Sequence, residues 1–188
     1  MKFAYADPPY PGLSSRHYRQ HPDFNGEVDH KQLVERLVQN YDGFVLHTGT
    51  PTLHLVLDCV RDAGLTSKDY HLLSWVKPFC SWKPGAQLQY TWEPVILKPL
   101  RSPTDSLRDW LSESMTTRKG TKGAKPRNVC WWLFEAVGAT NEDEIDDLFI
   151  GSGAVTEAWA SWCDFERYTH EHLFYDTTNE KESDEQRT

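Results

Sequence analysis

The sequence predicts an α/β protein in which a mostly parallel sheet is covered by helices on both faces. Short apolar runs, typical of buried strands, alternate along the chain with segments of helical periodicity. Glycine and proline separate these segments. The 188 residues, 38% of them hydrophobic and 13% aromatic, suit one domain with a substantial core. A collagen, a coiled coil or a wholly disordered chain is therefore excluded.

Five strands are expected from the apolar runs. The first covers residues 3–6 and must stop at Asp7-Pro8-Pro9-Tyr10, because consecutive prolines do not fit a central strand or a helix. The polar segments 13–28 and 101–125 are expected to be loops, the second of them mobile or a linker. The other four strands are expected at 44–47, 72–76, 90–97 and 145–150.

Four helices are expected between these strands. Asp29 is a candidate N-cap, and Gln32 three residues later completes a capping-box pattern, so a helix should begin here and end near Asn40. Proline or glycine marks the ends of the next two helices. These lie at 51–63 and 126–137, and a fourth is expected at 154–162. Trp131 and Trp132 have apolar neighbours, which favours core packing.

The net charge of −8 is unevenly distributed. Residues 1–138 contain seventeen basic and fourteen acidic residues, whereas residues 139–163 contain six acids and no base. Residues 164–188 contain eight acids and three bases, and we expect this acidic tail to be partly disordered. The mildly basic first part of the chain is therefore compatible with a surface that faces phosphate groups.

The remaining composition favours a cytoplasmic protein. No apolar run approaches the 18 residues of a membrane span, and the N-terminal residues lack the pattern of a signal peptide. The cysteines are widely spaced and form no C-x-x-C pair, so we expect reduced thiols and no structural zinc site. They are Cys59, Cys80, Cys130 and Cys163.

The turn Asp7-Pro8-Pro9-Tyr10, which we call the proline turn, is the most specific chemical signal in the chain. Consecutive prolines fix the backbone and free its carbonyl oxygens from a strand ladder. The Asp7 carboxylate and one such carbonyl can then accept both hydrogens of an exocyclic amino group. Tyr10 offers a ring on which a base can stack. The alternative is a rigid turn with no catalytic role.

A second signal is Phe149-Ile150-Gly151-Ser152-Gly153, which we call the glycine loop. It lies between an expected strand and an expected helix, where glycines allow a ligand to approach the backbone and the helix N-terminus favours negative charge. No third glycine follows, since Thr156 occupies that position. The dinucleotide fingerprint is therefore not met. A tight strand-to-helix turn is the alternative.

These motifs resemble those of the amino-methyltransferases that modify adenine N6 or cytosine N4 in DNA. The proline turn resembles their catalytic tetrapeptide, and the glycine loop with the preceding Asp147 resembles their S-adenosylmethionine loop. Lys125-Pro126 resembles their Lys-Pro motif beside the methionine end of the cofactor. Trp75-Val76-Lys77-Pro78 and residues 92–97 resemble strand segments of the target-facing region. The order, with the catalytic motif first, resembles the circularly permuted class β and especially small phage-type enzymes.

The resemblance implies a Rossmann-like methyltransferase domain over residues 1–163 that transfers a methyl group from S-adenosylmethionine to a flipped adenine, without a metal. Asp7 at the first position favours adenine over cytosine. The site residues implied for catalysis are Asp7, Pro8, Pro9 and Tyr10. Those implied for the cofactor are Asp7, Lys125, Pro126, Asp147, Phe149, Gly151, Ser152 and Gly153.

Two departures from the family pattern stand out. Only 35 residues follow Gly153, whereas the family continues with a strand whose terminal acid binds the cofactor ribose, so we expect a sheet shortened at the cofactor end. Glu166, Glu171 and Asp176 are the candidates for that acid. A large target-recognition domain is also missing, and residues 79–122 are the candidate for a minimal one. A homodimer that holds DNA with two copies is therefore a further expectation.

DNA contacts are expected from basic and aromatic residues in the polar segments, although a solvated loop is the alternative for each. These candidates are Arg16, His17, Arg19, Trp82, Lys83, Arg118, Lys119 and Lys122. Three other functions stay open. They are methylation of cytosine N4, methylation of RNA by the same site, and binding of nucleic acid by a methyltransferase relic without catalysis.

Overall fold

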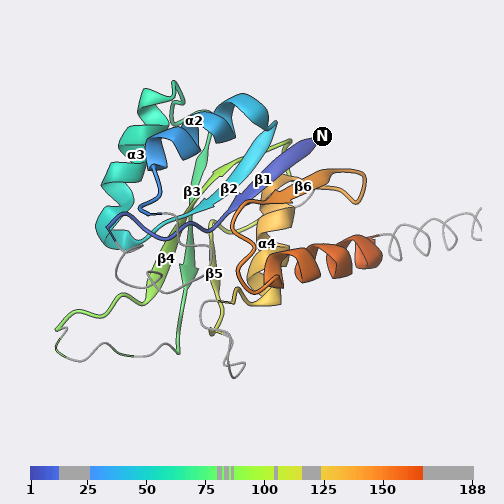
Figure 1. Cartoon of the computed structure of the whole chain (residues 1–188). Helices are drawn as coiled ribbons and strands as arrows, with labels where there is room; N and C mark the ends of the chain where they lie inside the picture. The colour runs from blue at the N-terminus through green and yellow to red at the C-terminus, as the bar shows by residue number, and fades with distance from the viewer. Residues whose placement is uncertain are drawn as a thin grey trace, which may run out of the picture.

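The computed structural model of the chain describes residues 1–12, 26–79, 82, 85, 87–103, 106–115 and 124–166. Six strands in these residues form one sheet with the order β5-β3-β4-β2-β1-β6 (Figure 1). The strands are β1 (Lys2–Ala6), β2 (Gly43–His47), β3 (His71–Val76), β4 (Trp92–Lys98), β5 (Trp110–Ser112) and β6 (Glu144–Asp147). The helices are α2 (His30–Asn40), α3 (Leu53–Asp62), α4 (Arg127–Val137) and residues 154–166, with a short 3-10 helix η1 (Thr50–Thr52) before α3.

The sheet is mostly parallel, as predicted. β1 pairs in parallel with β2 on one side and with β6 on the other, and β3 pairs in parallel with β5. β4 is antiparallel to both of its neighbours, β2 and β3. The start of β4 therefore lies at the same edge of the sheet as the carboxyl ends of β1, β2 and β3, which is where ligands bind in open α/β sheets.

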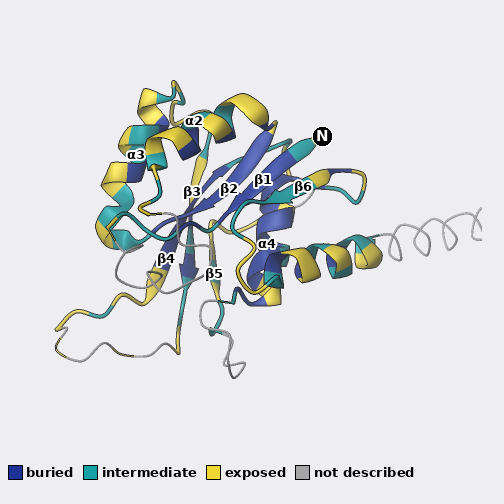
Figure 2. Ribbon diagram, viewed as in Figure 1, coloured by how far each residue is buried: buried dark blue, intermediate teal, exposed yellow. Residues whose placement is uncertain are grey.

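Helices cover both faces of the sheet, which confirms the predicted fold class (Figure 1). α2 and α3 bury Leu33, Val34, Leu37, Val56 and Val60 against one face. On the other face, α4 and residues 154–166 pack against strand side chains, with the Phe3 and Trp159 rings 5.4 Å apart. Figure 2 shows the resulting pattern, in which the central strands are buried and the outward sides of the helices are exposed.

The helix ends follow the local signals in the sequence. Asp29 caps α2, since its Oδ1 accepts a hydrogen bond of 3.0 Å from the Gln32 backbone N–H. Pro126 is the N-cap of α4, and Gly138 ends this helix in the left-handed conformation with φ 72°. Trp132 is buried in the core and Trp131 packs against its margin, as expected.

Three predicted boundaries were wrong. The segment 101–125, predicted as a loop, contains β5, which is too short to show a periodicity and exists because it pairs with β3. The last strand was predicted to reach residue 150, but β6 ends at Asp147, whose Oδ1 accepts from the Phe149 backbone N–H and turns the chain. The last helix extends to residue 166, three residues into the predicted tail, whereas residues 167–188 lie outside the described part of the chain.

Two further sequence-based expectations concern the cysteines and the membrane. Among the described residues, Cys59, Cys130 and Cys163 are thiols that form no disulfide, while Cys80 lies outside the described residues. No helix in the described part of the chain is long and apolar enough to cross a membrane.

Candidate active site

The proline turn and the glycine loop lie next to each other although some 140 positions separate them in the chain. They follow β1 and β6, which are parallel neighbours with Tyr5 opposite Asp147. The two carboxyl ends therefore open onto the same edge of the sheet. Burial, and to a smaller extent the nearby charge of Asp7, raises the pKa of the half-buried Asp147. Two acidic side chains from separate motifs thus share one site.

Lys125 connects Asp7 to a second carboxylate. Its Nζ lies 2.8 Å from Asp7 Oδ2 and 2.9 Å from Glu93 Oε1. The Lys125 side chain is only 7% exposed and that of Asp7 is 26% exposed. Burial disfavours the ammonium, but the charges of Asp7 and Glu93 outweigh it and raise the pKa of Lys125. Lys125 therefore stays charged between the two carboxylates.

Glu93 is the centre of a buried set of charges at the start of β4. In addition to Lys125, its Oε1 accepts from His47 Nδ1 at 2.6 Å and its Oε2 accepts from Lys77 Nζ at 2.5 Å. Burial disfavours its ionised form, but Lys125, His47 and Lys77 together hold the pKa of Glu93 well below its usual range. Asp7, His47, Lys77, Glu93 and Lys125 form what we call the ion cluster.

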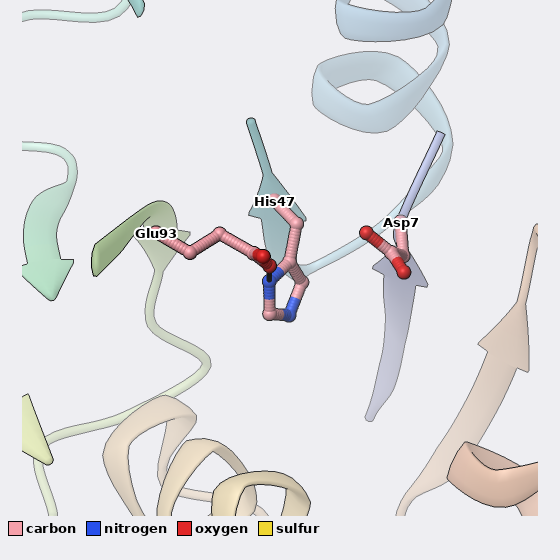
Figure 3. A group of neighbouring side chains, drawn as sticks. All are labelled: Asp7, His47 and Glu93. Carbon is pink, nitrogen blue, oxygen red and sulfur yellow. Dashed lines mark hydrogen bonds and ion pairs between the residues drawn. The ribbon is translucent and has the colours of Figure 1, made fainter. Parts of the chain in front are cut away.

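His47 ends β2 and is completely buried. Burial and the nearby Lys125 ammonium lower its pKa, so the ring is neutral near pH 7. Its Nδ1 faces the Glu93 carboxylate, which can only accept, and its Nε2 lies 2.8 Å from the Tyr5 hydroxyl. The partners thus assign the proton to Nδ1 and make Nε2 an acceptor for Tyr5. Figure 3 shows His47 and Glu93 in contact, with Asp7 facing them from the end of β1.

Asp7, His47 and Glu93 also have the composition of a metal site, since their ligand atoms all lie within 4.8 Å of one another. The Lys125 ammonium contacts both carboxylates of this group. Both ring nitrogens of His47 have protein partners as well. A lysine thus supplies the positive charge that a metal ion would otherwise bring.

The proline turn is supported from two sides. His30, the first residue of α2, donates from Nε2 to the Pro9 carbonyl at 3.2 Å. The Tyr10 ring lies against Gly49 in the loop after β2, so closely that a Cβ at position 49 would be 2.8 Å from Tyr10 Cδ2. Gly49 has an ordinary negative φ, so the lack of a side chain here serves to make room for the Tyr10 ring.

The glycine loop has the shape of a strand-to-helix ligand turn. Gly151 and Gly153 have φ values of 48° and 74°, which explains why glycine occupies both positions. The Gly153 N–H donates to the Ile150 carbonyl at 2.7 Å, and the helix begins at residue 154. A Cβ added to Gly153 would meet no atom within 4 Å, so there is open space beside the loop. Ser152 is exposed and Phe149 packs against the core.

The other predicted site residues have different positions. Pro126 is the N-cap of α4, directly after Lys125. Trp82 is 76% exposed, in the segment between β3 and β4 that also exposes Phe79 and Leu88. The remaining predicted nucleic-acid contacts lie outside the described residues. They are Arg16, His17, Arg19, Lys83, Arg118, Lys119 and Lys122.

The sequence analysis did not identify Tyr5, His47, Lys77 or Glu93 as site residues. A usable signal was present, because His47 and Glu93 are polar residues at the ends of strongly apolar runs, where an unpaired charge would be costly. The direction of β4, however, is a property of the sheet. Only its antiparallel pairing brings Glu93 to the same edge as Asp7.

Comparisons with known proteins give a structural likeness only. No model of a known protein family matches the chain, and no curated protein does. The crystal structure of the complex of M1.HpyAVI, a DNA methyltransferase, with SAM is similar, with a TM-score of 0.57 and 12% identity over 86% of this chain and 78% of that one. A second crystal structure of M1.HpyAVI has a TM-score of 0.52 and 14% identity over 86% and 76%. The chain therefore has the α/β fold of these methyltransferase structures.

Proposed function

We propose that this chain is an S-adenosylmethionine-dependent methyltransferase that methylates the exocyclic amino nitrogen of adenine in DNA. The observation that carries the proposal is the pairing of the proline turn with the glycine loop at adjacent parallel strand ends. This arrangement places a carboxylate acceptor beside a loop suited to a nucleotide-like cofactor. The fold shared with a DNA methyltransferase bound to SAM supports the same conclusion.

The residues around the glycine loop fit the cofactor. The left-handed Gly153 has open space beside it, and the N-terminus of helix 154–166 faces the same edge of the sheet. Asp7, Asp147, Phe149 and residues 151–153 would hold the cofactor, with Lys125 and Pro126 beyond Asp7. When bound, S-adenosylmethionine supplies a methyl carbon that is activated by a positively charged sulfur.

The chain's own part in the reaction is to orient the amino group. Asp7 Oδ1 and the Pro8 carbonyl accept the two amino hydrogens, which concentrates the lone pair on nitrogen and stabilises the positive charge that develops there. The lone pair of the oriented nitrogen would then accept the methyl group that a cofactor held by the glycine loop would supply, with the sulfur as the leaving group. The surplus proton then leaves the nitrogen for water or Asp7. Tyr10 stacks on the base, which must be flipped or single-stranded to reach the site.

A second candidate is a nucleic-acid-binding protein without catalysis. It is motivated by β6, which pairs with β1 alone among the described strands, so the strand expected to carry the ribose-binding acid is not part of the described sheet. The intact proline turn, with its Asp7 carboxylate 2.8 Å from Lys125 Nζ, argues against it.

Transfer of tritiated methyl groups to DNA and RNA, followed by mass spectrometry of the nucleosides, tests the proposal. We expect N6-methyladenine in DNA. Asp7→Asn should lower the rate at least a hundredfold, because the amide loses the charge that stabilises the transition state, while cofactor binding in calorimetry persists. Asp62→Asn, an exposed change at the end of α3, serves as the matched control. Unchanged transfer by Asp7→Asn would refute the role of Asp7, and no cofactor binding by the wild type would favour the second candidate.

A further inference from the structure

We propose that Glu93 is a positioning residue, which holds the Lys125 ammonium so that one Asp7 oxygen is bound by the protein and the other faces the substrate. The inference rests on the proposed function and names a residue that the sequence analysis did not identify as a site residue. It also specifies the substrate class. An Asp7 carboxylate paired with an ammonium can only accept hydrogen bonds, so the site selects amino groups over carbonyl groups.

The first argument is charge balance. The ion cluster contains two carboxylates, Asp7 and Glu93, two ammonium groups, Lys77 and Lys125, and the neutral His47. Glu93 and Lys125 are both almost fully buried. Buried charges persist when they are paired, so each member of the cluster depends on the others. Glu93 neutralises the part of the cluster that Asp7 does not reach.

The second argument is geometric. Lys125 has a flexible four-carbon stem, so one contact does not define where its ammonium sits. Glu93 supplies a second contact at 2.9 Å, in addition to that of Asp7 at 2.8 Å. Glu93 is in turn held by His47 and Lys77. The position of the ammonium is therefore determined by Glu93 as well as by Asp7.

The third argument is that the hydrogen-bonded chain closes on itself. Asp7 binds Lys125, Lys125 binds Glu93, Glu93 binds His47, and His47 Nε2 accepts from the Tyr5 hydroxyl at 2.8 Å. Tyr5 lies on β1, two residues before Asp7, so the backbone between these residues closes the ring. The ring thus ties three strands and the start of α4 to one carboxylate. Such closed sets of hydrogen bonds hold a side chain in one rotamer.

Glu93→Gln keeps the shape of this residue and removes its charge. Without that charge the Lys125 ammonium is free to move toward the second Asp7 oxygen, which the amino group of the substrate needs. We expect the single-turnover rate with tritiated S-adenosylmethionine and DNA to fall at least tenfold, as for other small displacements of reacting groups. The cofactor dissociation constant should stay within threefold of the wild-type value. Lys98→Gln, at the other end of β4, should behave like the wild type.

A pH profile distinguishes this role from a merely structural one. Asp7 and Glu93 both raise the pKa of Lys125, so removing one of them lowers it. The titratable or charged groups around the ammonium are Asp7 after β1, Tyr5 on β1, His47 on β2, Lys77 after β3, Glu93 on β4 and Cys130 on α4. The wild-type rate should be constant from pH 7 to 9.5, whereas the Glu93→Gln rate should decline over this range.

Two measurements separate failure of the proposal from failure of the proposed function. Carbon-13 NMR of lysine-labelled protein, with the Lys125 signal assigned through a Lys125→Met variant, follows the ammonium without any substrate. A lower Lys125 pKa in Glu93→Gln supports the proposal even if the wild type transfers no methyl group, and an unchanged pKa overturns it. If Glu93→Gln does not fold, Glu93→Asp retracts the charge by one methylene. The Glu93→Asp variant should have a lower methyl transfer rate that does not change with pH. A transfer rate equal to that of the wild type would overturn the proposal.

Discussion

Lys125→Met should destabilise the protein strongly at neutral pH, because it leaves the carboxylates of Asp7 and Glu93 without the ammonium between them. Removing one partner of a buried ion pair costs about 3–5 kcal/mol. The lower end applies here, since Glu93 keeps Lys77 and His47, and Asp7 retains some contact with solvent. For a chain of this length, about 3 kcal/mol corresponds to a fall in Tm of roughly 6–12 °C.

The pH dependence of this loss has a defined sign. In the wild type, the pKa of Glu93 is held below its ordinary value near 4.5, so the ionised side chain stabilises the fold at any pH above that value. This contribution is lost as the pH falls toward the lowered pKa. In Lys125→Met the carboxylate lacks its main counter-charge, so its pKa rises and protonation relieves the cost. The difference in Tm between the two proteins should therefore narrow as the pH is lowered from 7.5 to 5.

Differential scanning calorimetry at several pH values measures this effect, with Lys98→Met at the far end of β4 as the control. The double variant Lys125→Met/Glu93→Gln should melt above Lys125→Met, because it returns the cluster to one carboxylate and one ammonium group. A Tm for Lys125→Met within 2 °C of the wild type at pH 7.5, or a difference that widens on acidification, would refute the charge argument.

Two further changes test other parts of the structure. Gly49→Ala puts a Cβ 2.8 Å from Tyr10 Cδ2, so the Tyr10 ring must shift. We expect a several-fold lower methyl transfer rate with a nearly unchanged Tm. An unaffected rate would show that the position of the Tyr10 ring does not matter for catalysis. Asp143 accepts a hydrogen bond of 2.7 Å from Arg101 Nη1, and Arg101 holds the pKa of Asp143 low despite the burial of this carboxyl group. Asp143→Asn should therefore lower the free energy of unfolding, measured in urea at pH 7, by about 2 kcal/mol. That difference should shrink below about pH 4, where the wild type loses the contribution, and a constant difference would contradict the assignment.

The sequence alone determined the elements whose signals are local. Asp29 with Gln32 marked the start of α2, and Pro126 and Gly138 marked the ends of α4, because caps and left-handed turns depend on a few adjacent residues. The proline turn and the glycine loop were recognisable for the same reason. Their chemistry is carried by short motifs whose backbone geometry is encoded in proline and glycine.

Only the tertiary structure decided how these pieces combine. β5 has three residues and forms because β3 offers it an edge, which no periodicity predicts. Glu93 reaches Asp7 because β4 runs antiparallel between β2 and β3, so its first residues lie at the carboxyl edge of the sheet. Lys125, which the resemblance associates with the cofactor, pairs with Asp7 and Glu93. The ion cluster joins residues from five separate segments, and sequence distance carries no information about such contacts until the strand order is known.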